Sequence, residues 1–361
     1  GQVSETVEVQ ADANLVETRA TGVNQTIDNV RVLEMPLNGR QVTELILLSG
    51  AASTSAQGTL NPGTRNYPTT IINVAGGMQT GLTYTLDGVN HNDAYNNLNY
   101  PLPFPDALQE FKVETGALEA NYGFHSSGQV NAVTKSGTNQ IHGDLFEFVR
   151  NASLNARNAF ALANDGLKRH QFGGTIGGPI IHNKLFFFAG EQGTKQNSLQ
   201  TPTFAYIPTP AMMAGDFTTY ASAACNSGRP LTLRAPYVNN KIDPGLFSKV
   251  AVNIVNNNLF PKTSDPCGQV RFSGVVNIKE WITLGRADYQ LSDKQSIFAR
   301  YLDAWREAPS DYDGKNALTA TLGNVHYRVH TLALGQTYLL SPNAVASFRG
   351  GLKRAWIPKE V

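Results

Sequence analysis

The sequence is poor in charged residues, in cysteine and in long apolar runs. Only 16% of its 361 residues are charged, and the formal net charge is +1. No cluster of Lys and Arg supplies the basic face that a nucleic-acid-binding protein needs, so this class is excluded. No apolar run reaches the roughly 20 residues that a membrane-spanning helix requires. Membrane-spanning strands stay open, because their alternating pattern leaves only a weak hydropathy signal.

Recognisable catalytic motifs are also missing. The chain has no His-Glu-x-x-His and no Gly-x-Ser-x-Gly, and its seven His are scattered. His91 and Asp93 are two potential metal ligands without a third. Gln171–Pro179 is rich in glycine but lacks the Lys-Ser/Thr of a phosphate loop, and Pro179 stands where the helix would begin. The sequence therefore predicts no enzyme, no cofactor and no metal site.

The stretch 82–138 carries the strongest local pattern. Leu82–Leu86 alternates as a half-buried strand does, and Asp87-Gly88 after it is a strong hairpin signal. In Glu110–Thr115 charged and apolar residues alternate, which predicts a strand that exposes charge on one face. Gln129–Thr134 predicts a third strand that ends in a glycine-containing turn.

In this order and spacing the three blocks resemble the plug domain of TonB-dependent outer-membrane receptors. That family has a Leu-Asp-Gly-Val turn, a strand of alternating charge and a Gly-rich strand ending in Thr-Lys-Ser-Gly. The matching residues are Leu86, Asp87, Gly88 and Val89, then Thr134, Lys135, Ser136 and Gly137. The resemblance implies an α+β plug domain at residues 1–140, followed by antiparallel transmembrane β-barrel strands at residues 141–361.

A second resemblance lies in Gln171–Gln192. Its Gly-Gly-Pro, and Lys184 followed by a run of three Phe, are similar to the first barrel hairpin of the Oar-like branch of this family. The Pro- and Asn-rich residues 193–278 indicate a long extracellular loop. The family's barrel has about 22 strands, whereas we count about seven after residue 140. We therefore expect an N-terminal fragment with an incomplete barrel.

Two segments near the C-terminus, Trp281–Leu291 and Ala344–Trp356, show the alternation of barrel strands. One face of each is expected to meet lipid and the other a polar lumen. Arg or Lys in lipid near the midplane costs about 2–4 kcal/mol, so the basic side chains must point inward. The predicted outward residues are Trp281, Tyr289, Phe348 and Leu352, and the predicted inward residues are Arg286, Arg349 and Lys353.

Near the N-terminus lies a short run of β-prone residues. Glu5, Thr6, Val7, Glu8 and Val9 resemble a TonB box, the extended segment that pairs with the energising partner by strand addition. The alternative is that this run is the first edge strand of the plug.

Two helices are expected in the first fifty residues. Asp28 is the predicted N-cap of Asn29–Glu34, and Asn38 that of Arg40–Leu48. The second helix should bury one apolar face, formed by Val42, Leu45, Ile46 and Leu48. Residues 51–70 are predicted as a loop, and Ile71–Val74 as a strand of the sheet that Leu82–Leu86 joins.

The loop at residues 90–105 is rich in Asn and Tyr. Amides and aromatic rings suit a sugar or a peptide, and the candidate ligand contacts are Asn92, Tyr95, Asn97 and Tyr100. The alternative is a solvated, turn-rich loop. Cys225 and Cys267 both lie in the long loop. They are either unrelated thiols or a disulfide in an oxidising compartment, and we predict the disulfide.

The resemblance implies a receptor of the bacterial outer membrane that takes up a large or scarce ligand with energy from a TonB–ExbB–ExbD type complex. The alternative on the same scaffold is a surface adhesion or signalling receptor without import. A soluble β-rich binding module is a third reading, which the lipid-facing pattern of Trp281–Leu291 disfavours. The expected partners are this complex, an unidentified extracellular ligand and outer-membrane lipid. The sequence does not identify the ligand.

Overall fold

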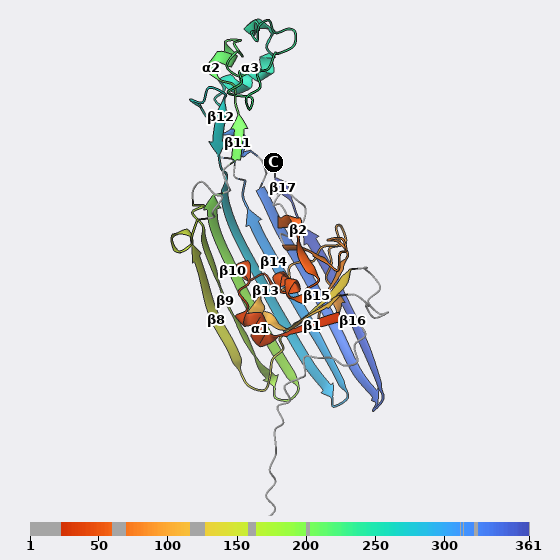
Figure 1. Cartoon of the computed structure of the whole chain (residues 1–361). Coiled ribbons are helices and arrows are strands. Elements are labelled where there is room, and N and C mark those ends of the chain that lie inside the picture. Colours follow the sequence, from red (N-terminus) through yellow and green to blue (C-terminus); the bar gives the residue numbers. More distant parts are fainter. Residues whose placement is uncertain are drawn as a thin grey trace, which may run out of the picture.

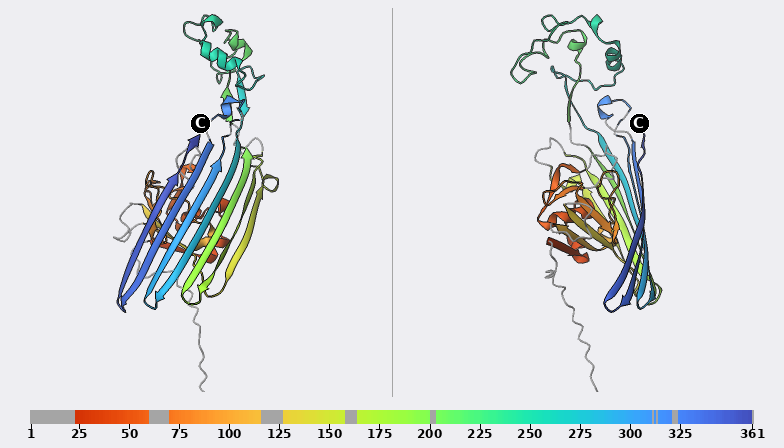
Figure 2. Two further views of the ribbon diagram at one scale, coloured as in Figure 1. Left: turned by 180° about the vertical axis from the view of Figure 1, so that it is seen from behind. Right: turned by 90° about the vertical axis from the view of Figure 1, so that its right-hand side faces the viewer.

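The computed structural model describes residues 23–59, 70–115, 127–157, 164–199, 203–310, 312, 314–320 and 324–360. A sheet of long, tilted strands forms a curved wall, and a small α/β domain lies against one face of it (Figures 1 and 2). A separate head projects beyond one end of the wall. Among the described residues, no helix is long and apolar enough to cross a membrane.

The wall is antiparallel and runs in the order β16-β15-β14-β13-β10-β9-β8, with the short β17 paired to β15. It is not closed within the described residues. Its strands are β8 (His142–Asn151), β9 (Lys168–Ile181), β10 (Leu185–Leu199), β13 (Val275–Ser292), β14 (Gln295–Ala308), β15 (Asn324–Ser341), β16 (Ala344–Trp356) and β17 (Lys359–Glu360). The predicted strands Trp281–Leu291 and Ala344–Trp356 are therefore confirmed.

Short turns join β9–β10, β13–β14 and β15–β16 at one end of the wall, and longer connections leave the other end (Figure 1). The longer connections include the short 3₁₀ turns η5 (Ala152–Leu154) and η7 (Ala317–Thr319). This asymmetry agrees with the outer-membrane plan of short turns on one side and long loops on the other.

The predicted faces of the wall are confirmed. Arg286, Arg349 and Lys353 lie on the inner face, where they contact the α/β domain. The side chains predicted to point outward lie on the opposite face; Phe348 and Leu352 are 65% and 73% exposed. The outer face also carries charge, because Asp303 accepts hydrogen bonds from Arg328 at 3.1 and 3.4 Å.

The α/β domain is built on a five-stranded sheet of order β1-β6-β7-β4-β5. Its strands are β1 (Val23–Asp28), β4 (Leu82–Leu86), β5 (Val89–Asn90), β6 (Leu108–Thr115) and β7 (Gly128–Thr134), and β4 pairs with β7 in parallel. The three strands predicted from residues 82–134 therefore lie in one sheet. β6 alternates buried and half-buried residues as expected, but β4 is buried on both faces because the wall covers it.

The first predicted helix is confirmed. Helix α1 (Asn29–Glu34) begins at Asp28, whose carboxylate accepts a hydrogen bond from the Arg31 amide at 2.9 Å. The prediction of a second helix is wrong at the N-terminal end of that helix. Two 3₁₀ segments, η1 (Asn38–Arg40) and η2 (Val42–Ser49), replace a single helix, because Gly39 and Arg40 have positive φ.

Asn38 does not cap this segment. Its side-chain oxygen accepts a hydrogen bond from Arg150 of the wall at 3.1 Å, so a tertiary contact replaces the local one. Within η2, Val42, Leu45 and Ile46 are buried as predicted, whereas Leu48 is exposed.

The prediction of a loop over residues 51–70 is wrong for its first part. Ala52–Thr59 forms strand β2, which pairs with β3 (Thr70–Val74) in a separate two-stranded sheet. β3 therefore does not join the sheet of β4, contrary to our expectation. A third 3₁₀ turn, η3 (Pro105–Ala107), leads into β6.

The head occupies most of the predicted long loop. β10 and β13 extend into that range, and the hairpin of β11 (Thr203–Tyr206) and β12 (Gln269–Phe272) connects wall and head (Figure 1). The head itself contains α2 (Pro210–Met213), η6 (Pro244–Leu246) and α3 (Lys249–Asn256). The predicted disulfide is confirmed: Cys225 and Cys267 are bonded, with their Cα atoms 5.4 Å apart.

Candidate functional site: the contact between the α/β domain and the wall

Asp87 brings the two signature motifs of the α/β domain together. It occupies the β4–β5 turn, where Asp87 and Gly88 have φ values of 53° and 77°, a conformation that glycine and aspartate tolerate best. Its carboxylate accepts hydrogen bonds from the Thr134 amide at 2.9 Å and the Thr134 hydroxyl at 3.0 Å. The turn and the end of β7 are thereby locked to each other.

The same carboxylate pairs with two arginines of the wall. Arg286 of β13 donates to one oxygen at 2.9 Å, and Arg300 of β14 donates to the other at 3.1 Å. The side chains of Asp87 and Arg300 are 2% and 1% exposed. Asp288 and Thr331 take further hydrogen bonds from the two guanidinium groups.

This network contains two carboxylates, Asp87 and Asp288, for two cations, and Asp87 is the one that Arg286 and Arg300 share. Desolvation of such charges is expensive, and loss of one partner from a buried pair costs about 3–5 kcal/mol. Loss of Asp87 would therefore weaken the contact, which also includes an apolar core shared by domain and wall. If the partners separate, each charge needs water or another partner.

A second contact lies further along β16. The Lys353 ammonium donates to the Asn90 side-chain oxygen at 2.7 Å and to the Asn92 carbonyl at 3.0 Å. Beside it, Gly351 leaves room for Val89: a Cβ built at position 351 would stand 2.7 Å from the Val89 Cγ1 and 2.7 Å from the Leu332 carbonyl oxygen. A larger residue at 351 would push the β4–β5 turn away from the wall.

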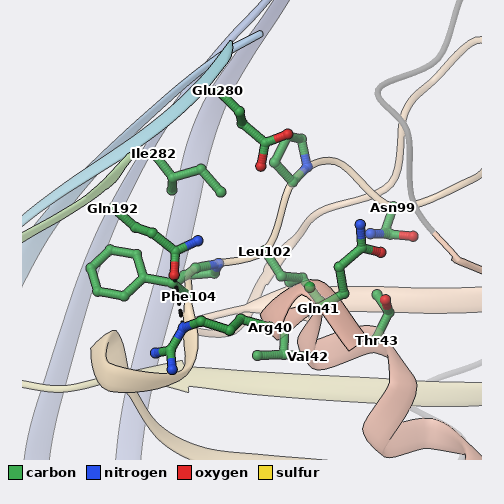
Figure 3. A pocket seen from close by; sticks show the side chains of 13 residues that line it. Arg40, Gln41, Val42, Thr43, Asn99, Leu102, Phe104, Gln192, Glu280 and Ile282 are labelled. Atoms are coloured by element: carbon green, nitrogen blue, oxygen red, sulfur yellow. Dashed lines mark hydrogen bonds between the residues drawn. The ribbon is translucent and has the colours of Figure 1, made fainter. Parts of the chain in front are cut away.

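A third contact surrounds Arg40. Its guanidinium lies over the rings of Phe146 and Phe148, 4.5 and 4.2 Å from their centroids. It is ion-paired with Asp106 and donates to the Gln192 side chain at 3.0 Å (Figure 3). Burial lowers the pKa of Arg40, an effect that Asp106 opposes. A planar cation between two rings fits the preference of arginine for aromatic faces.

His91 is buried behind the Lys353 contact. Its Nε2 lies 2.9 Å from the Pro101 carbonyl, and its ring packs edge-on against Tyr100 with centroids 5.9 Å apart. Burial lowers the pKa of His91 to about 3, and the Arg300 charge acts in the same direction. The neutral imidazole is therefore part of the folded contact.

Two cavities flank the contact. One of about 50 Å³ lies beside Arg40, where Glu280 and Ile282 of the wall face the α/β domain (Figure 3). The other, of about 490 Å³, lies next to Asp87 and is lined by Arg286, Phe298 and Arg349. The second is large enough to hold water molecules beside the buried charges.

The candidate ligand residues divide into two pairs. Asn92 and Tyr100 are buried: Asn92 accepts a hydrogen bond from the Tyr84 amide at 2.7 Å and donates to the Leu82 carbonyl at 2.8 Å. They hold the loop onto its own domain, and their role as ligand contacts stays a prediction. Tyr95, 75% exposed, and Asn97 remain available to a ligand. The segment Glu5–Val9 lies outside the described residues.

Sequence reasoning missed Asp87 as an ion-pair partner, as well as Arg300, Arg40 and Asp106. A usable signal was present: Arg300 stands at an inward position of an alternating strand, and an inward charge needs a partner. The identity of that partner, 213 residues away, has no local signal.

The fold and the contact define a class of protein. Residues 133–360 match the family described as "Outer membrane beta barrel domain". This match spans more than half of the chain, so the protein belongs to that family and lies in the bacterial outer membrane.

Individual outer-membrane proteins are similar to this chain in sequence or in structure. The TonB-dependent transporter Oar of Myxococcus xanthus is 32% identical over 115 residues, which are 30% of this chain and 11% of Oar. The outer membrane transporter YddB from Escherichia coli has a similar structure, with a TM-score of 0.54 at 12% identity over 91% of this chain and 38% of YddB. A variant of the ferric enterobactin receptor PfeA from Pseudomonas aeruginosa, in complex with enterobactin, also has a TM-score of 0.54 at 12% identity, over 94% of this chain and 41% of PfeA. The chain thus spans less than half the length of these relatives, and the two structures establish similarity of fold.

Proposed function

We propose that the protein is a TonB-dependent outer-membrane receptor of the Oar-like branch, with the α/β domain as the plug of a barrel that the wall begins. A TonB–ExbB–ExbD type complex would pull on Thr6–Val9 and displace the plug, so that an extracellular ligand passes. The observation that carries this proposal is the buried pairing of Asp87 with Arg286 and Arg300, which fixes a separate domain to the inner face of an outer-membrane sheet.

The chemistry of the contact suits a reversible plug. The apolar core that domain and wall share keeps its stabilisation in an aqueous lumen, whereas the ion pairs exchange their partners for water once water enters. The cavity of about 490 Å³ beside Arg286 supplies a place from which water reaches the pair. The contact would therefore hold at rest and release under force.

The test measures the exposure of Val89, which is half-buried against Gly351. A Val89→Cys variant of the full-length protein is produced in cells and treated with a bulky maleimide, with and without a protonophore. Energised displacement predicts labelling that falls when the protonophore is present and falls equally with Val7→Pro, which removes a backbone donor needed for strand addition. Leu246→Cys in the head, at a residue 64% exposed, is the control and should label under all conditions.

The alternative, an adhesion or signalling receptor without import, predicts a different result. Labelling of Val89→Cys would then be unaffected by the protonophore and by Val7→Pro. A Val89→Cys, Gly351→Val variant checks the contact itself, because the larger side chain at 351 meets the β4–β5 turn. Its labelling should be high with and without the protonophore.

A further inference from the structure

The head contains an apolar cavity that the contact between domain and wall does not involve. Its volume is about 440 Å³, within the range of small-molecule sites. α2 contributes Met212 and Met213, α3 contributes Val252 and Val255, and the disulfide residue Cys267 lies in its lining. The cross-link between Cys225 and Cys267 therefore also fixes one side of the cavity.

Aromatic rings form another side. Phe217 packs edge-on against Tyr220, Tyr237 and Phe247, with ring centroids 6.4, 5.2 and 6.4 Å apart. All four rings border the cavity. Rings in such an arrangement can pack against the ring of a ligand with their faces or their edges. Such packing costs little side-chain entropy, because each side chain has few rotatable bonds.

The polar groups of the lining are hydroxyls, and no ionisable carboxylate, amine, guanidine or imidazole is among them. Ser248 is the N-cap residue of α3 but its side chain makes no capping hydrogen bond. Within the described part of the chain, no hydrogen bond occupies the hydroxyls of Tyr220 and Tyr237 either. The lining thus carries four hydroxyls, those of Tyr206, Tyr220, Tyr237 and Ser248, and the Tyr206 hydroxyl accepts a hydrogen bond from Gln269 at 3.2 Å.

From this lining we infer that the head holds a binding site for a neutral aromatic compound that carries a hydroxyl or carbonyl group. A charged ligand would lose its hydration without gaining a counter-charge. A purely aliphatic one would leave the hydroxyls without partners. This site is separate from the plug contact, and its occupation does not depend on the proposed uptake.

The probe is benzophenone, a neutral aromatic ketone that cross-links to nearby C–H bonds under near-ultraviolet light. The whole protein is placed in phospholipid nanodiscs, so that no detergent competes, and adducts are mapped by mass spectrometry. Saturable adducts are expected on the peptide that contains Met212 and Met213. Phenol in excess should suppress them, and choline should not.

Matched tryptophan substitutions on α3 test the cavity itself. Val252→Trp fills it and should reduce saturable labelling at least tenfold, whereas Val250→Trp, at a side chain 68% exposed on the same helix, should change nothing. Tyr220→Phe with Tyr237→Phe keeps the shape and removes two hydroxyls, which should weaken the probe about tenfold. This second variant still tests the site if Val252→Trp prevents the head from folding.

Three results would overturn the site. The first is labelling of Met212 and Met213 that does not saturate. The second is labelling that both the Val252→Trp variant and the double Tyr→Phe variant leave unchanged. The third is displacement by choline but not by phenol, which would identify an aromatic cage for cations instead.

Discussion

The contact between the α/β domain and the wall differs from the head in what holds it together. The contact combines an apolar core, to which both parts contribute side chains, with the pairing of Asp87 with Arg286 and Arg300. The head is built on aromatic rings and a covalent cross-link between Cys225 and Cys267. One arrangement can be released when its charges find other partners, and the other cannot be released without reduction.

This difference distinguishes a contact that can be released from a part of the fold that stays cross-linked. The proposed release of the α/β domain needs contacts that water can replace, and ion pairs meet that need. A head that projects beyond the wall has no large core of its own, and the disulfide compensates by restricting its unfolded chain.

The largest effect is expected for Asp87→Asn. The change leaves the buried Arg300 without its carboxylate partner and Arg286 with Asp288 alone, and the cost should be about 3–5 kcal/mol. The loss of unfolding free energy is measured by urea unfolding of the protein in micelles, with the protection of β4 and β7 from hydrogen exchange as the readout. A loss below about 1 kcal/mol would show that the pairing is incidental to the contact.

The disulfide should matter nearly as much, but only within the head. Cys225→Ser with Cys267→Ser releases a cross-link between residues separated by 42 positions, at a cost of about 2–4 kcal/mol. Protease cleavage should appear between residues 203 and 274, while the wall strands stay protected from hydrogen exchange. Loss of protection in β13 or β14 would contradict the separation of head and wall.

His91 predicts a pH dependence of the contact. Burial lowers its pKa to about 3, against about 6.5 in the unfolded chain. The unfolded state therefore binds more protons between these values, and the contribution is complete above the unfolded pKa and lost as the pH falls toward 3. Between pH 7 and pH 5.5 the loss should be about 1 kcal/mol.

This loss can be measured by hydrogen exchange of residues 91–101 at both pH values, corrected for intrinsic rates. In a His91→Asn variant the difference between the two pH values should disappear. An unchanged difference would assign the pH dependence to another group.

The smallest effect is expected for Asp303→Asn, the same chemical change on the opposite face of the wall. Asp303 contacts Arg328 and His330, whose side chains are 50% and 32% exposed. It lies toward the end of β14 from which the longer connections leave, where lipid headgroups and water reach a charge, so the pair should contribute less than about 1 kcal/mol. Unfolding under the conditions used for Asp87→Asn gives the comparison. Equal losses of unfolding free energy for the two variants would show that the buried pairs of Asp87 and the exposed pair of Asp303 contribute equally.

Local chemistry explains which parts of the structure the sequence predicted. The Asp87-Gly88 turn follows from two residues that tolerate positive φ, and Trp281–Leu291 follows from alternation alone. Asp28 caps α1 through an amide three residues away. Each of these features depends on interactions within a few residues.

Long-range contacts explain the misses. The helix expected from Arg40 is broken by positive φ at Gly39 and Arg40, in a segment whose Asn38 side chain bonds to Arg150 of the wall. β2 has a polar sequence without alternation, and its pairing with β3 gives it order. The partners of Asp87 lie 199 and 213 residues further along the chain, so no local pattern pairs them.

The central claim, that Asp87 fixes the α/β domain to the wall through Arg300, is tested most directly by a double-mutant cycle. Unfolding free energies are measured for Asp87→Asn, Arg300→Met and the double variant. We predict a coupling of about 2 kcal/mol or more, with the double variant more stable than the sum of the single losses implies. Losses that add to within about 0.5 kcal/mol would show that the two side chains act independently, and would contradict the claim.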